Sequence, residues 1–150
     1  MARFLACGDS ALTVELGQGI SPEINARVTA LSALISEARL PGVRELVPAY
    51  CSLTVQYDPE QTSHTQLTAA LTELCGHLDG PAAAAGALVE LPVLYGGFCG
   101  PDLGFVAQNA GLSPDEVIGI HSKTDYLIYM LGFTPGFPYL GGMDGRIAAP

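Results

Sequence analysis

The sequence has very little positive charge. Its 150 residues include 6 lysine and arginine side chains against 15 aspartate and glutamate side chains, so the formal net charge is -9. Lys123 is the one lysine, and the arginines are scattered along the chain. Proteins that bind DNA or RNA need clustered basic side chains to displace the counterions of the phosphates. The composition therefore argues against nucleic acid as a partner.

Long apolar runs are also missing. The two longest, residues 82–91 and 126–133, are too short to cross a bilayer. Only a few residues precede Cys7, so an export signal does not fit there. We therefore expect a cytoplasmic protein with no membrane partner. Hydrophobic residues nevertheless make up 49% of the chain and charged residues 14%, which excludes disorder and predicts a sizeable core.

Patterns typical of metal sites and of common catalytic sites are absent. The cysteines, Cys7, Cys51, Cys75 and Cys99, include no C-x-x-C pair and have no histidine at metal-ligand spacing. We expect reduced thiols that pack as small apolar side chains, in preference to disulfides or a zinc site, and no metal. The sequence contains no G-x-S-x-G, H-E-x-x-H, Walker A or dinucleotide-binding pattern.

The first half of the chain alternates between strand patterns and amphipathic helix patterns. Ser21 followed by Pro22 predicts the start of one helix, and a second helix is predicted from Thr62 or Ser63. The order β-β-α-β-β-α predicts an α+β two-layer sandwich, in which two helices cover one face of an antiparallel sheet. The strands predicted from alternating apolar residues are 3–7, 11–16, 43–49 and 51–57.

The composition changes in the middle of the chain, where residues 81–87 contain only alanine, glycine and proline. This stretch predicts a linker between a domain of residues 1–80 and a second domain of residues 88–150. Two or three strands cannot close a sheet, so we expect the second domain to be incomplete. Its predicted strands and short helices are 88–94, 101–110, 114–121 and 126–133.

Two glycine-rich segments are candidates for a binding site. The turn at 95–101 precedes a helix, where backbone N–H groups can hold an anion, although a structural turn explains the same glycines. In the segment 131–142, glycine and proline are expected to prevent regular structure, and the aromatic rings are costly to leave in water. We expect this segment to fold against a core, as an ordered connector, or to line an apolar pocket or partner surface. The candidate pocket residues are Tyr95, Gly96, Gly97, Asp102, Phe133, Pro135, Gly136, Phe137, Pro138 and Tyr139.

His121 and Asp125 are the candidate catalytic residues. They flank the end of a predicted helix and the start of a predicted strand, and a histidine beside a carboxylate can act as a base with its orienting partner. A histidine in the last turn of a helix also interacts favourably with the helix dipole, so a structural role explains its position as well. His64 and His77 lie off an apolar stripe and are expected to be solvated.

Five segments together resemble the family of 5-oxoprolinase B subunits. They are Gly8–Leu12, Val47–Leu53, Pro92–Gly97, Gly100–Leu103 and Leu131–Gly142. This family also includes the sporulation kinase inhibitor KipI and allophanate hydrolase subunit 1, with the carboxyltransferase domain, subdomain C and D. The resemblance covers nearly the whole chain and is most specific in the last of these segments.

The resemblance implies a component of an ATP-dependent 5-oxoprolinase, which opens 5-oxo-L-proline to L-glutamate together with the other 5-oxoprolinase subunits (A and C). ATP is then used by the complex, at a site not identified in this chain. The resemblance also implies that residues 88–150 are the truncated start of a cyclophilin-like β-barrel. Many relatives carry Glu-Phe where this chain has Phe98-Cys99, which counts against a carboxylate acting in that turn. Two alternatives stay open: an inhibitor that binds a sensor histidine kinase, and a component of a biotin-dependent carboxyltransferase.

Overall fold

The computed structural model describes residues 2–78 and 86–150, which form two compact units. Residues 129–139 belong to the first unit together with 2–78, and the remaining described residues form the second unit. Most of the predicted linker at 81–87 lies outside the described residues, so the predicted domain boundaries stay a prediction. Within the described part of the chain, no helix is both long and apolar enough to cross a membrane.

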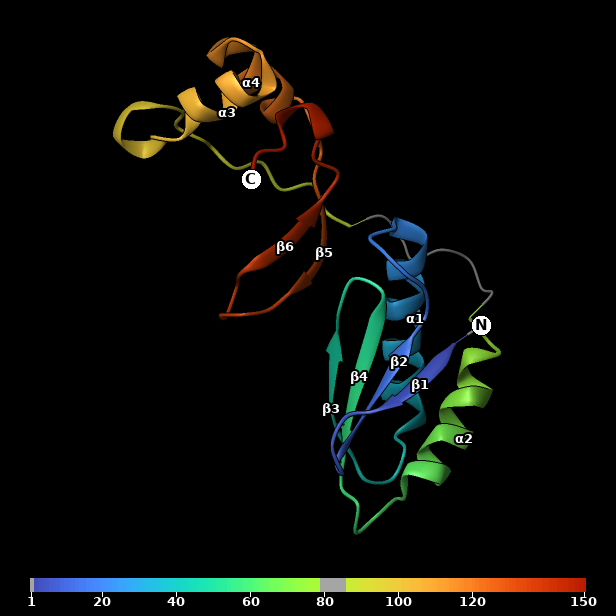
Figure 1. The fold of residues 1–150 in the computed structure, drawn as a ribbon. Helices are drawn as coiled ribbons and strands as arrows, with labels where there is room; N and C mark the ends of the chain where they lie inside the picture. Colours follow the sequence, from blue (N-terminus) through green and yellow to red (C-terminus); the bar gives the residue numbers. More distant parts are fainter. Residues whose placement is uncertain (1, 79–85) are drawn as a thin grey trace. The chain divides into compact units, whose positions relative to one another are not determined.

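A four-stranded antiparallel sheet forms one layer of the first unit (Figure 1). Its central strands are β2 and β4, where Leu12 pairs with Val55 and Val14 pairs with Leu53. Because successive side chains point to opposite faces, these four residues share the inner face. The strands, in their order across the sheet, are β1 (Arg3–Ala6), β2 (Ala11–Glu15), β4 (Ser52–Tyr57) and β3 (Val43–Pro48).

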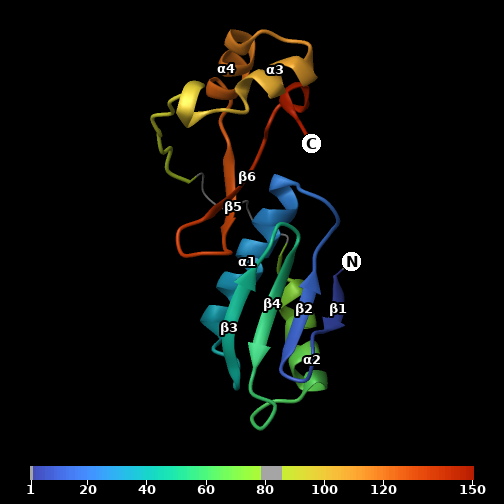
Figure 2. The ribbon, with the colours of Figure 1, turned by 60° about the vertical axis from the view of Figure 1, so that its left-hand side comes forward.

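Two helices, α1 (Pro22–Ala38) and α2 (His64–Cys75), cover one face of this sheet (Figure 2). The Oγ of Ser21 accepts a hydrogen bond from the Ile24 N–H at 3.4 Å, which starts α1 as predicted. A capping box of Ser63 and Gln66 starts α2, because each side chain bonds the backbone of the other residue. The predicted mixed α and β fold with a small antiparallel sheet is confirmed.

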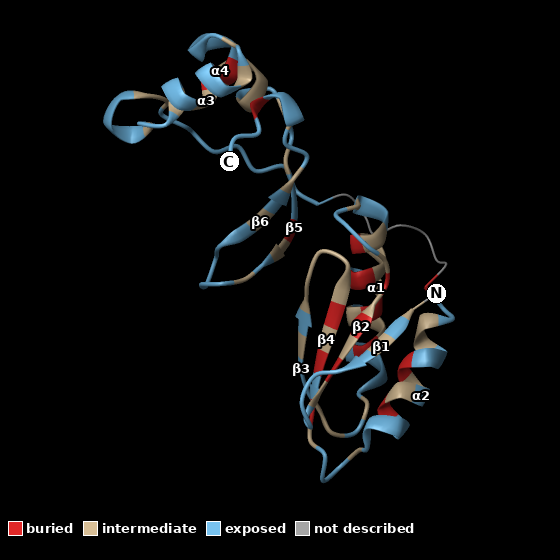
Figure 3. Cartoon of the chain, in the orientation of Figure 1, coloured by how far each residue is buried: buried red, intermediate tan, exposed pale blue. Residues whose placement is uncertain are grey.

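The core of the first unit lies between the sheet and the two helices (Figure 3). The inner face of β2 and β4 is almost completely buried, and the apolar stripes of α1 and α2 close over it. Removing this apolar surface from water is the main stabilising contribution to folding of the unit. The buried side chains are Leu12, Val14, Leu16, Val28, Leu31, Ile35, Leu53, Val55, Tyr57, Leu67, Leu71 and Leu78.

The second unit has a much smaller core. Its helices α3 (Leu103–Ala110) and α4 (Pro114–Ser122) pack together with the 3-10 helix η2 (Gly145–Ile147), and a further 3-10 helix, η1 (Gly97–Cys99), lies before them in the sequence. A second capping box, formed by Ser113 and Glu116, starts α4 as predicted. The buried apolar residues of this core are Ala107, Val117 and Ile147.

The strand predicted at 88–94 is not formed. No ladder joins this segment to another strand within the described residues, and Leu88, Leu91 and Leu94 are 77%, 75% and 74% exposed. A sequence that favours strands becomes a strand only where a neighbouring strand supplies hydrogen bonds, and Pro92 cannot donate one. The prediction was wrong because the pattern gives no information about the pairing partner.

A separate two-stranded sheet is formed by β5 (Leu127–Leu131) and β6 (Pro138–Gly141). We call residues 127–141 the β5–β6 hairpin. The sequence predicted the first of these strands, but glycine and proline were wrongly expected to prevent the second. Pro138 is the first residue of its strand, a position where proline is tolerated in sheets.

We expect Leu53→Ala to lower the free energy of unfolding of the first unit by about 2–5 kcal/mol, because a fully buried leucine leaves a cavity. Leu5→Ala is the matched control, since Leu5 is a leucine on the opposite face of the same sheet and is 37% exposed. Its cost should be well below that of Leu53→Ala. Urea unfolding of both variants measures the difference, and equal losses would contradict this description of the core.

Candidate functional site

An aromatic cluster in the first unit brings together residues that are far apart in the sequence. Tyr50, in the loop between β3 and β4, packs against Tyr129 and Tyr139, with ring centroids 5.1 and 6.2 Å apart. The contacts continue from Tyr139 to Phe137 at 5.5 Å, and from Phe137 to Phe133 at 5.9 Å. Tilted and edge-to-face arrangements like these are the ones that aromatic rings favour. We call these five residues the aromatic cluster.

A buried polar side chain on α1 fixes the loop that carries Tyr50. Asn25 is 8% exposed, and its Nδ2 donates to the carbonyl oxygens of Ala49 and Tyr50 at 3.3 and 3.5 Å. A buried amide without such partners would lower stability. The loop and its tyrosine are therefore attached to the helix that closes the core.

The tip of the β5–β6 hairpin is ordered by its own backbone. The N–H of Gly132 donates to the carbonyl oxygen of Phe137 at 3.0 Å, and the N–H of Phe137 donates to that of Thr134 at 3.1 Å. Pro135 and Gly136 occupy the middle of the turn from Thr134 to Phe137, and Gly136 has φ +80°. Proline followed by a glycine with positive φ is the pattern of a type II turn.

Within this tip, Phe133 has an unusual backbone conformation. Its φ of +59° lies in the left-handed region, which non-glycine residues rarely adopt, and the N–H of Thr134 closes a three-residue turn on the carbonyl of Gly132 at 2.6 Å. The Phe133 side chain is nevertheless 87% exposed. Of the two expectations for this segment, packing against a core does not hold for Phe133, whose ring contacts Phe137, and lining a pocket or partner surface stays a prediction.

A second cluster lies in the second unit. The hydroxyl of Tyr95 is 2.6 Å from Nδ1 of His121, and the His121 ring is 5.3 Å from the ring of Tyr126. The hydroxyl of Tyr126 is buried without a hydrogen bond of suitable geometry in the described part of the chain. Burial raises the pKa of the Tyr126 phenol, and the nearby Thr124 side chain offsets part of this rise. We call Tyr95, His121 and Tyr126 the tyrosine–histidine cluster.

The predicted pairing of His121 with Asp125 is not formed. Among the described residues, no hydrogen bond or ion pair joins the two side chains, and Tyr95 is the partner of His121 instead. Residues four apart share a face only while a helix continues, and α4 ends at Ser122. Proximity in the sequence, at the end of a helix, therefore does not bring the two side chains together.

The backbone geometry of the glycine-rich turn at 95–101 explains why it contains glycines. Gly96 and Gly97 have φ of +73° and +55°, and the N–H of Gly100 donates to the carbonyl of Gly96 at 3.0 Å. A Cβ on Gly100 would lie 2.6 Å from the Gly96 nitrogen, so no larger residue fits. Asp102 precedes α3 without capping it through its side chain. A role of this turn in binding stays a prediction.

The predicted site residues lie in both units. Those from Tyr95 to Asp125 belong to the second unit, and those from Phe133 to Tyr139 belong to the first. Sequence reasoning missed Tyr50, Tyr126 and Tyr129. The available signal for Tyr50 was an aromatic residue in a short connection between two strands, within one of the segments that carry the family resemblance.

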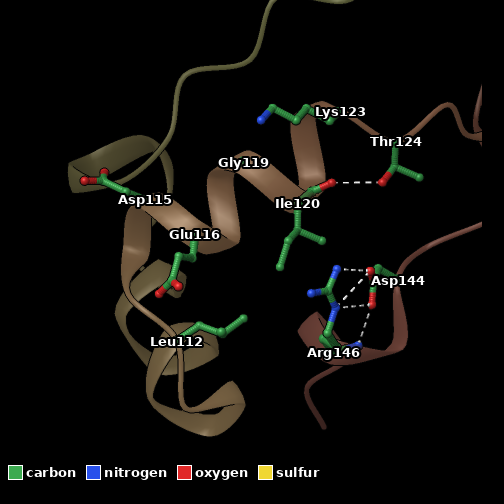
Figure 4. A pocket seen from close by; sticks show the side chains of 9 residues that line it. All are labelled: Leu112, Asp115, Glu116, Gly119, Ile120, Lys123, Thr124, Asp144 and Arg146. Carbon is green, nitrogen blue, oxygen red and sulfur yellow. Dashed lines mark hydrogen bonds and ion pairs between the residues drawn. The ribbon is translucent and has the colours of Figure 1, made fainter.

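A pocket of about 580 Å³ lies on the second unit, beside α4 and η2 (Figure 4). Asp144 and Arg146 form a close ion pair in it at 2.6 Å, and hydrogen bonds from Arg146 lower the pKa of Asp144 to about 2. The charge of Arg146 is thereby balanced, and none of the predicted site residues lines this pocket. Its lining residues are Leu112, Asp115, Glu116, Gly119, Ile120, Lys123, Thr124, Asp144 and Arg146.

The cysteines are four free thiols. Cys51 and Cys75 are partly buried, and burial raises the pKa of the Cys75 thiol, which therefore stays protonated. Cys7 and Cys99 are exposed, so the expectation that all four pack as buried apolar side chains was wrong for these two. In the described ranges, no three His, Cys, Asp or Glu side chains come close enough to hold a metal ion.

Comparison with known proteins identifies the family. Residues 2–150 match the family model described as carboxyltransferase domain, subdomain C and D. The chain belongs to this family. It is 42% identical to the 5-oxoprolinase B subunit of Bacillus subtilis (strain 168) and 32% identical to the 5-oxoprolinase B subunit of Escherichia coli O157:H7. The predicted resemblance to the family of 5-oxoprolinase B subunits is confirmed.

The matches extend along nearly all of this chain but over only part of the relatives. They cover 95% and 99% of this chain, but 64% of the Bacillus subtilis protein and 67% of the Escherichia coli protein. The chain therefore spans about two thirds of the length of these relatives. The crystal structure of TTHA0988 is similar with a TM-score of 0.74 and 37% identity, over 100% of this chain and 27% of that one. The cyclophilin-like description of residues 88–150 stays a prediction.

The tyrosine–histidine cluster offers a matched pair of variants. Tyr95→Phe removes a hydroxyl that is hydrogen-bonded to His121, and we expect it to lower the stability of the second unit by about 0.5–1.5 kcal/mol. Tyr126→Phe removes a buried hydroxyl without such a bond, and it should be neutral or stabilising. Amide hydrogen exchange in the second unit measures both effects. A loss of stability in Tyr126→Phe as large as that in Tyr95→Phe would show that the hydrogen bonds of these two hydroxyls are assigned incorrectly.

Proposed function

We propose that this chain forms part of the B subunit of an ATP-dependent 5-oxoprolinase, a cytoplasmic complex that also contains the A and C subunits. The observation that carries the proposal is the 42% identity to a 5-oxoprolinase B subunit over 95% of the chain. The complex opens 5-oxo-L-proline to L-glutamate. Water adds across the lactam C–N bond, giving a carboxylate and an amine, while ATP is hydrolysed.

In this proposal the complex uses ATP, and we assign no nucleotide site to this chain. The sequence has no Walker A pattern, and Lys123 is its one lysine. In the second unit, Lys123 and Arg146 are the basic residues, and Arg146 is already paired with Asp144. In that unit, Lys123 is therefore the one lysine or arginine side chain left to neutralise a triphosphate.

We also propose His121 as the candidate catalytic residue; Asp125, the other candidate, forms no hydrogen bond or ion pair with it among the described residues, so the proposal gives it no orienting role. Because Tyr95 occupies Nδ1, the nitrogen that can exchange a proton with a substrate is Nε2. Tyr95 would fix the orientation of the ring, as a positioning residue. We further propose that the predicted pocket residues from Phe133 to Tyr139 act at a substrate or partner surface, together with Tyr50.

We expect the isolated chain to have no 5-oxoprolinase activity. ATP-dependent release of glutamate from 5-oxo-L-proline should appear only when the protein that carries this chain is combined with the A and C subunits from the same genome. Mixtures of the A and C subunits without it are the control. Turnover by the chain alone would contradict the proposal, because the reaction would then need no partner.

The two alternatives are separate outcomes of the same experiment. A complete mixture that releases no glutamate but binds and inhibits a sensor histidine kinase would replace the proposal with the regulatory function. Carboxyl transfer that depends on an added biotin carrier, again without glutamate release, would replace it with the carboxyltransferase function.

A further inference from the structure

One of the acidic side chains that line the pocket beside α4 and η2, Glu116, is fixed by only one of its oxygens. Its Oε2 accepts hydrogen bonds from the backbone N–H and the hydroxyl of Ser113, at 2.8 and 2.7 Å. Its Oε1 accepts no hydrogen bond in the described part of the chain. The bonds from Ser113 also lower the pKa of Glu116, so the carboxylate is charged at neutral pH. The pocket therefore contains a carboxylate oxygen that is held in place and still free to accept.

Arg146, on η2, is fixed in the same way. Its Nε and Nη2 donate to Oδ2 of Asp144 at 3.1 and 2.6 Å. Because the guanidinium is planar and these two nitrogens face Asp144, Nη1 lies on the other side of the group. Figure 4 shows a nitrogen of Arg146 turned away from Asp144, toward the space below Ile120. Nothing within residues 2–78 and 86–150 accepts a hydrogen bond from Nη1, so this donor is oriented and unused.

Between these two groups the pocket is open and partly apolar. Ile120 and Leu112 line it with aliphatic side chains, and Ile120 extends into it from α4 (Figure 4). Gly119 leaves the helix face open, since a Cβ there would meet nothing within 4 Å. The volume of about 580 Å³ lies within the range of about 300–1,000 Å³ that is usual for pockets that bind small molecules. The pocket therefore has room for a small ligand with a short aliphatic part.

The charges of the pocket select a ligand that carries both signs. Lys123 lines the pocket and forms no ion pair with any described residue, whereas Asp115 points away from the space in front of Arg146 (Figure 4). A plain anion would meet Glu116, and a plain cation would meet Lys123.

We propose that this pocket binds a free amino acid with an acidic side chain, such as L-glutamate. The α-carboxylate accepts from Nη1 of Arg146, the α-ammonium donates to Oε1 of Glu116, and the side-chain carboxylate lies near Lys123. The aliphatic carbons of the ligand contact Ile120 and Leu112. The inference goes beyond the proposed function and does not rest on it, because the ligand class follows from the groups that line the pocket.

Titration calorimetry of the protein that carries this chain tests the ligand class. L-glutamate should bind with a Kd about tenfold or more below that of glutarate, which has both carboxylates but no ammonium. 5-Oxo-L-proline has one carboxylate and an uncharged nitrogen, so it should also bind more weakly than L-glutamate. Absence of saturable L-glutamate binding would overturn the proposal, and so would equal affinity for glutarate. Tighter binding of 5-oxo-L-proline would overturn it too, because the pocket would then suit the cyclic compound.

The decisive variant is Glu116→Gln, because it separates recognition from folding. Glutamine completes a capping box equally well, as Gln66 does at the start of α2, so the melting temperature should change little. Loss of the negative charge should abolish the preference for L-glutamate over glutarate. Glu73→Gln is the matched control, since it makes the same change at an exposed position on α2 and should keep the preference. A preference that survives in Glu116→Gln would refute the assignment.

Two further variants test where the ligand lies. Gly119→Leu fills the pocket with a better helix former, so the stability of α4 should not fall while binding of L-glutamate and glutarate is lost. Lys123→Met should weaken binding of both compounds, because both carry a second carboxylate. Normal binding in a folded Gly119→Leu variant would place the ligand elsewhere and overturn the proposal. Glutamate release by the complete complex is measured separately, so failure of the proposed function and failure of this inference are distinguishable.

Discussion

Burial of the inner face of β2 and β4 is the constraint on which the rest of the first unit depends. Leu12, Val14, Leu53 and Val55 have no exposed surface, and they lie in the two central strands, where both neighbours supply ladder hydrogen bonds. The helices α1 and α2 are held in place because their apolar stripes have this layer to cover. Removal of any one of these side chains affects both layers.

The aromatic cluster depends on this core indirectly. Asn25 is on α1, beside the buried stripe of the helix, and it binds the loop that presents Tyr50. Tyr50 in turn supports Tyr129 and Tyr139 of the β5–β6 hairpin, which has no third strand within the described residues. A two-stranded hairpin is marginally stable by itself. Packing of tyrosine rings therefore contributes order that the hairpin cannot obtain from its own hydrogen bonds.

Most of the first unit could be predicted from the sequence, because its elements are encoded locally. Alternating apolar residues mark β2 and β4, and Ser21 and Ser63 mark the starts of two helices. What failed was pairing between distant segments. The pattern at 88–94 gave no information about a partner strand, and β6 formed although glycine and proline argued against it. The same limitation applies to the site, since nothing local connects Tyr50 with Tyr139, or Tyr95 with His121.

The two capping boxes use the same geometry with different chemistry. Gln66 supplies a neutral amide at the start of α2, whereas Glu116 supplies a carboxylate at the start of α4. Hydrogen bonds from Ser113 lower the pKa of Glu116, so its contribution to stability is present above the carboxyl pKa of the unfolded chain and is lost as pH falls through the lower, folded value. Acid therefore loosens the first turn of α4 and leaves that of α2 intact, so that two caps of one design respond differently to acidic surroundings.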